Sequence, residues 1–123
     1  MKFIKHFLVF LTLISGSFVA NADVNPDIWP YIKERMFEDK PIKEVNFLKI
    51  DGPKRASSGA QVPINIKLTP KAGIEIKKVT IIIDSNPVQL AATYHLTRNT
   101  QALDLSTRIR METDSFVRVV GED

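Results

Sequence analysis

The sequence of 123 residues contains no cysteine. This absence excludes disulfides, thiolate metal ligands, a thiol nucleophile and a thiol carrier within these residues. Glycine is also scarce, with 5 residues. The glycine patterns of phosphate-binding loops, dinucleotide-binding folds and serine hydrolases are absent. We therefore expect a domain that is stabilised by its hydrophobic core alone, and about a hundred residues suffice for one modest core.

Residues that could support catalysis or metal binding are few. Of the 2 histidines, His6 lies in the apolar N-terminal segment, and His95 stands alone among alternating strand residues. Metal sites normally use three or four ligands, so a metal role for His95 is only an alternative reading. Adjacent acidic pairs at 38–39 and 122–123 are typical of solvated loops rather than of a glycosidase pair. No catalytic, cofactor-binding or metal-binding residue is predicted, and we do not expect an enzyme.

The N-terminus has the three parts of a secretory signal peptide. Lys2 and Lys5 precede an apolar run from Phe7 to Ile14, and Ala20-Asn21-Ala22 provides a small-x-small cleavage site. The apolar run is too short to span a bilayer. We therefore predict a signal peptide at residues 1–22, cleavage after Ala22, and a mature domain at residues 23–123. The membrane would then be met only during export.

The charge balance changes once this segment is removed. The chain has 17 Lys and Arg against 14 Asp and Glu. Residues 1–22 hold two of the lysines and no acidic residue, so the mature part has 15 basic and 14 acidic side chains, a formal charge of +1. A nearly neutral domain gives no support for binding nucleic acid, which requires a strongly basic face.

The strongest structural signal is the β-branched run Val79–Asp84, which is apolar on both faces and predicts a central, buried strand. Asp84-Ser85-Asn86-Pro87 ends it as a turn. Gln61–Leu68 alternates cleanly, so it predicts a half-buried antiparallel strand, and Pro63 places this strand at an edge or leaves its start unpaired. Further strands are expected at 45–50, 92–97, 103–112 and 116–120.

These strands, separated by turn signals, indicate a mainly β fold, an Ig-like antiparallel β-sandwich. One short amphipathic helix is expected before them, at Ile28–Phe37, with Asp27 as its N-cap and Pro30 in its first turn. Its apolar stripe favours a lid over the protein's own core, at an edge or end of the sandwich. A docking helix for a partner is the alternative.

Arginines form the one candidate binding surface. Arg108 and Arg110 lie on one expected strand and Arg118 on the next, and we expect these two strands to pair. With Arg98 nearby, the side chains would make a guanidinium patch for an anionic ligand or an acidic partner. The alternative is a solvated strand face in which arginine protects an edge.

Several short motifs occur in an order that resembles the SoxY-like domain. They are Trp29…Phe37-x-Asp39, Pro53-x-Arg55-Ala56, Val62-Pro63-Ile64, Ile83-Asp84-Ser85-Asn86-Pro87, Ser106-Thr107-Arg108-Ile109-Arg110 and Val117-Arg118-x-Val. The resemblance covers essentially the whole mature chain. Within the family it is closest to the fused SoxYZ-like carriers that are associated with quinoprotein dehydrogenases.

The resemblance implies a periplasmic Ig-like domain without cofactor, which acts in the oxidation of sulfur compounds such as thiosulfate. It also implies a SoxZ-like partner domain or protein, with dehydrogenase or cytochrome components as further partners. In the family, a C-terminal Gly-Gly-Cys segment carries the sulfur, whereas this sequence ends at Asp123 without it. Two interpretations stay open: a truncated or split form that lacks its last strand and carrier tail, or a domain without the carrier function. No functional residue of the family is carried over.

A different class of function fits the same pattern. A periplasmic chaperone-like or adhesin-like sandwich would pair with other proteins through an exposed strand edge and have no carrier role.

Overall fold

The structure is a computed structural model that describes residues 12–13, 28–38 and 40–123. Most of the predicted signal peptide and the predicted N-cap Asp27 lie outside these residues. The elements of the described part are β1 (Thr12–Leu13), α1 (Ile28–Phe37), β2 (Leu48–Asp51), β3 (Val62–Leu68), β4 (Lys78–Ile83), β5 (Leu90–His95), β6 (Leu103–Ile109) and β7 (Val117–Glu122). The mainly β fold with one short helix is confirmed.

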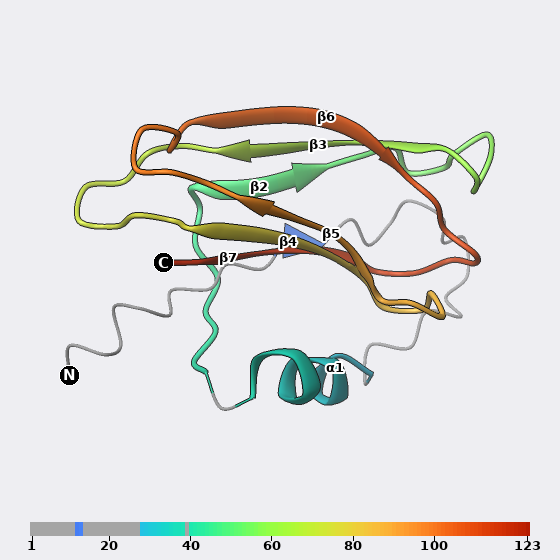
Figure 1. The fold of residues 1–123 in the computed structure, drawn as a ribbon. Helices are drawn as coiled ribbons and strands as arrows, with labels where there is room; N and C mark the ends of the chain where they lie inside the picture. The colour runs from blue at the N-terminus through green and yellow to red at the C-terminus, as the bar shows by residue number, and fades with distance from the viewer. Residues whose placement is uncertain (1–11, 14–27, 39) are drawn as a thin grey trace.

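The described strands form two antiparallel sheets that pack face to face (Figure 1). Sheet A has the order β1-β7-β4-β5, and sheet B has the order β2-β3-β6. The predicted central strand is confirmed as β4, which pairs with β5 on one side and β7 on the other. Because it has a strand on each side and a layer on each face, β4 is the most enclosed segment of the fold.

The main core lies between the two sheets. Inward side chains of β3 and β4 are almost fully buried, as in Ile66, Val79 and Ile81 with no exposed surface. Burying each such side chain contributes about 1.5–3 kcal/mol. The inward residues of β5 and β6 are less protected, and Ala92, Tyr94 and Leu103 remain only partly buried against this core. The sandwich is therefore tight in the middle and looser where β5 and β6 lie.

Helix α1 covers the outer face of sheet A, on the side away from sheet B (Figure 1). Ile32 and Phe37 pack there against Ile82 of β4 and Val120 of β7, forming a second, smaller core. The helix bounds and its role as a lid over the protein's own core are confirmed. The lid lies over a sheet face instead of an edge or end, because the outward side chains of β4 and β7 are themselves apolar.

The expected pairing of the last two strands is wrong. β6 pairs with β3 in sheet B, whereas β7 pairs with β4 and β1 in sheet A. Consecutive strands are usually neighbours, but here the connection between them crosses from one sheet to the other. Arg108 and Arg110 therefore do not share a strand pair with Arg118.

Pro63 lies near the start of β3, which is the middle strand of sheet B. The neighbouring β2 pairs with β3 only from Asn65 to Leu68, so it ends before it reaches Pro63. The second of the two alternatives for this proline is thus the correct one: the start of the strand is unpaired on one side.

Candidate functional site

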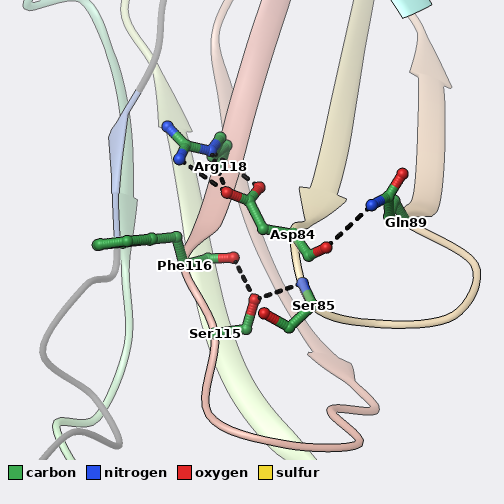
Figure 2. A network of polar contacts seen from close by, with 6 residues as sticks. All are labelled: Asp84, Ser85, Gln89, Ser115, Phe116 and Arg118. Atoms are coloured by element: carbon green, nitrogen blue, oxygen red, sulfur yellow. Dashed lines mark hydrogen bonds and ion pairs between the residues drawn. The ribbon is translucent and has the colours of Figure 1, made fainter. Parts of the chain in front are cut away.

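The most distinctive polar group of the fold is a buried ion pair at one end of sheet A. Asp84 directly follows β4, and Arg118 lies on the adjacent β7, where it is paired with Ile82. The Nε of Arg118 donates to Oδ1 and Oδ2 of Asp84 at 2.9 and 3.0 Å, and its Nη2 donates to Oδ2 at 2.7 Å (Figure 2). The two side chains are only 3% and 0% exposed. Charges taken out of water in this way must be paired and hydrogen-bonded.

Aromatic rings complete the surroundings of the guanidinium group. The Cζ of Arg118 lies 4.4 Å from the ring centroid of Trp29 and 5.4 Å from that of Phe116. A guanidinium over an aromatic face is attracted by the ring quadrupole, and the attraction is larger where water is excluded. Since Trp29 belongs to α1, this contact ties the helix to the ion pair and so to β4 and β7.

The turn after β4 has its own hydrogen bonds. Ser115 Oγ accepts from the backbone N–H of Ser85 at 2.9 Å and donates to the carbonyl of Phe116 at 2.8 Å (Figure 2). Gln89 Nε2 donates to the carbonyl of Asp84 at 3.0 Å, and Arg35 of α1 donates to the side-chain carbonyl of Gln89. The polar groups of the network thus satisfy one another, and the network serves to hold the fold together.

The four arginines of the expected patch are not brought together. Arg118 is buried with Asp84, so it presents no charge to an outside anion. Arg98 lies in the turn after β5, and its Nε is 3.9 Å from Oε1 of Glu75. Arg110 donates to Glu112 at 2.8 Å, and this hydrogen bond, with the negative charge of Glu112, raises the pKa of Arg110. Arg108 is exposed and has no partner within the described residues.

Arg108 shares the outer face of sheet B with other polar side chains. Asn65 Nδ2 donates to Asp104 Oδ1 at 2.9 Å and to Ser106 Oγ at 3.1 Å, which links β3 to β6. A shallow hollow of about 730 Å³ lies at one end of this face and is bordered by Asp51, Asn65, Ser106 and Arg108. Its position on an open sheet face suits contact with another macromolecule better than enclosure of a small ligand.

Asn86 connects the two sheets at the end of β6. Its Nδ2 donates to the carbonyl of Arg110 at 2.8 Å, and its Oδ1 accepts from the backbone N–H of Glu112 at 3.0 Å. The side-chain amide thus occupies the place that a neighbouring strand would take beside residues 110–112. The turn that was predicted at Asp84–Pro87 is confirmed, and it acts as a clamp between the layers.

Within the described residues, no cluster of three or more His, Asp or Glu side chains is arranged to hold a metal ion. His95 is exposed at the end of β5. In the described part of the chain, no helix is long and apolar enough to cross a membrane.

Comparison with known proteins assigns the chain to a family. The family model described as "Sulfur oxidation protein SoxY" matches residues 33–123. The chain belongs to the SoxY family. Its matched region includes Asp84, Arg118 and the polar face of β6, although Trp29 lies just before the match. No curated protein matches the sequence.

A solved structure supports the fold of this SoxY family member independently. The structure of the sulfur carrier protein SoxY from Chlorobium limicola f thiosulfatophilum superposes with a TM-score of 0.63 at 20% sequence identity. The similarity covers 80% of this chain and 86% of that chain. The two-layered β fold is therefore shared with SoxY.

The sequence alone did not indicate the pairing of Asp84 with Arg118. One signal was available: Arg118 is the single charged residue in the apolar run Val117–Val120. A charge in a strand that is apolar on both faces requires a buried partner of opposite sign. The partner itself could not be chosen from the sequence, because 34 residues separate the two side chains.

Proposed function

We propose that this chain is a periplasmic, non-catalytic SoxY-type domain that acts in the oxidation of sulfur compounds such as thiosulfate. The observation that carries the proposal is the match to the SoxY family over residues 33–123. The signal-peptide pattern at residues 1–22 supports the periplasmic location. The order of short motifs favours the fused SoxYZ-like subtype that is associated with quinoprotein dehydrogenases.

Within this proposal the 123 residues act as a scaffold. They contain no cysteine, so the thiol that holds sulfur in a carrier is not among them. The buried polar groups Asp84, Ser115 and Arg118 are hydrogen-bonded to one another or to the backbone. In this arrangement they stabilise the fold.

The proposed partner is a SoxZ-like domain or protein, and dehydrogenase or cytochrome components are the proposed further partners. Co-expression of the tagged full chain with the SoxZ-like protein of the same genome tests this pairing. We expect a stable complex that survives gel filtration. A chain that elutes without the SoxZ-like protein at every ratio tested contradicts the proposed partner.

Reading the gene beyond codon 123 tests the scaffold role separately. In-frame codons for Gly-Gly-Cys would make the polypeptide a carrier and contradict a scaffold without the thiol. A stop codon at that point supports the scaffold. Mass spectrometry of the protein from a periplasmic extract tests the location, because the expected mature chain begins at Asp23.

A chaperone-like or adhesin-like sandwich is the alternative, and the free strand edges in the described part of the fold favour it. The co-purification experiment distinguishes the two, since specific binding to the SoxZ-like protein is expected only of a SoxY-type domain.

A further inference from the structure

The outer edge of sheet B carries free hydrogen-bonding groups. Within the described residues β6 has β3 as a neighbour on one side and no strand on the other. Backbone groups of successive strand residues point to alternate sides. The N–H of Met111 donates to Gly59, on the side of β3, whereas the carbonyl of Arg110 points the other way, to Asn86. By the same alternation the N–H and C=O groups of Asp104, Ser106 and Arg108 face the free side.

The free part of this edge has a defined length. Asn86 already occupies the edge beside residues 110–112 through its two hydrogen bonds. At the other end β6 begins at Leu103. The stretch open to a new strand is therefore 104–108, and Ser106 lies at its centre.

The charges along this stretch would complement those of a second, antiparallel copy of the same stretch. Asp104 and Arg108 lie at equal distances from Ser106 on the outer face of the sheet. If a second β6 lies antiparallel with Ser106 opposite Ser106, Asp104 of each chain faces Arg108 of the other. Both groups are available: Arg108 has no partner in the described part of the chain, and Asp104 uses Oδ1 to accept from Asn65, which leaves Oδ2.

The inner face of β6 favours the same arrangement. Leu103, Leu105 and Thr107 are only partly buried, while their partners on β3 are 0–3% exposed. A hollow of about 260 Å³ extends between the edges of β5 and β6 and is lined by Ile81, Tyr94 and Thr107, among others. A second copy of β6 would place its own inward side chains beside this partly exposed apolar surface and remove it from water.

We propose that two copies of this chain associate through β6, antiparallel about a twofold axis at Ser106. The two three-stranded sheets join into one continuous sheet, and the interface is isologous, with the same surface on both chains. The occupant is a second copy and not a strand of an unrelated protein, because the order Asp104-Ser106-Arg108 is its own complement. The proposal stands without the proposed role in sulfur oxidation.

Sedimentation velocity of the full chain over a concentration series tests the dimer. Arg108→Asp and Asp104→Arg each place like charges opposite each other twice, and we expect each to raise the dissociation constant of the dimer about tenfold or more. The double variant Asp104→Arg/Arg108→Asp reverses both members of each pair, so it restores the affinity. This rescue also shows that the single variants are not merely misfolded.

A backbone variant gives an independent test. Ser106→Pro removes an N–H that faces the free side and leaves the ladder with β3 intact, so the dimer is lost while the circular dichroism spectrum is retained. Lys49→Glu, on the same outer face but on β2, is the matched control and leaves the dissociation constant unchanged. A chain that is monomeric up to its solubility limit overturns the proposal, as does a double variant that stays as weak as the single variants. A dimer that Ser106→Pro leaves intact also overturns it.

Discussion

Two pairs of aspartate and arginine in this fold differ in their exposure to water: one pair is buried and the other is exposed. Asp84 and Arg118 are buried under α1 and bind each other in a bidentate ion pair. Asp104 and Arg108 lie on the outer face of the β6 edge, where the aspartate is held by Asn65 and the arginine has no described partner. The residue types are the same, and the surroundings decide their roles.

The difference teaches how to separate structural charges from charges available for recognition. The buried pair cannot exchange its partner without exposing apolar surface, so its contribution is to the stability and uniqueness of the fold. The exposed pair contributes little to the isolated domain, because water solvates both groups. Its order along the strand matters only when a second surface approaches.

The largest effect is expected from Arg118→Met, which leaves Asp84 buried without its partner. Removing one member of a buried ion pair typically costs about 3–5 kcal/mol, and urea unfolding measures the loss. The double variant Asp84→Leu/Arg118→Met removes the orphaned charge as well, so it recovers most of the stability. A loss below about 1 kcal/mol in the single variant would show that the pair does not hold the two strands together.

Asn86→Ala should have the next largest effect, because it removes both hydrogen bonds between the turn after β4 and the end of β6. We expect a loss of about 2 kcal/mol in the free energy of unfolding. Asn99→Ala, in an exposed turn with no such bonds, is the matched control and stays within about 0.5 kcal/mol. Equal losses in the two variants would contradict the role of Asn86 as a clamp.

Trp29→Leu tests the contact between α1 and the guanidinium group. Leucine keeps an apolar side chain over the sheet but lacks the ring face 4.4 Å from Arg118, so we expect a loss of about 1–2 kcal/mol. Tyr31→Leu, on the exposed side of the same helix, serves as the comparison. Thermal unfolding of both variants measures the difference, and identical midpoints would contradict the contact.

The smallest effect on stability is expected from Arg108→Met. The side chain is exposed and unpaired in the described structure, so the free energy of unfolding should change by less than about 0.5 kcal/mol. Arg108→Met and Arg118→Met make the same substitution on two strands that are consecutive in the sequence. Their losses in the free energy of unfolding therefore compare an exposed arginine directly with a buried one. A large loss of stability would show that Arg108 has a structural partner.

Much of the fold was accessible from the sequence because local patterns carry it. The β-branched run at 79–84 predicted a central strand, the helical spacing at 28–37 predicted the bounds of α1, and the alternation at 61–68 predicted β3. These signals depend on the side chains within one segment. The tight turn at Asp84–Pro87 was also accessible, since its residue types favour turns.

The candidate site was less accessible because it depends on which strands meet. The expectation that Arg108, Arg110 and Arg118 share a face assumed that consecutive strands pair, and the crossing between β6 and β7 separates them. The partner of Arg118 is Asp84, which directly follows β4 and is distant in the sequence. The clamp formed by Asn86 was equally hidden, since the residue types in a turn do not specify what their side chains reach.

Asn86 is followed by Pro87, and this order affects how long the clamp endures. Asparagine side chains convert slowly to aspartate when the backbone nitrogen of the next residue attacks the amide and closes a five-membered ring. Proline has no N–H at that nitrogen, so this route of ageing is blocked at residue 86. A carboxylate in place of the amide could not donate to the carbonyl of Arg110, and the order Asn-Pro thus preserves the link between the two sheets over the lifetime of the protein.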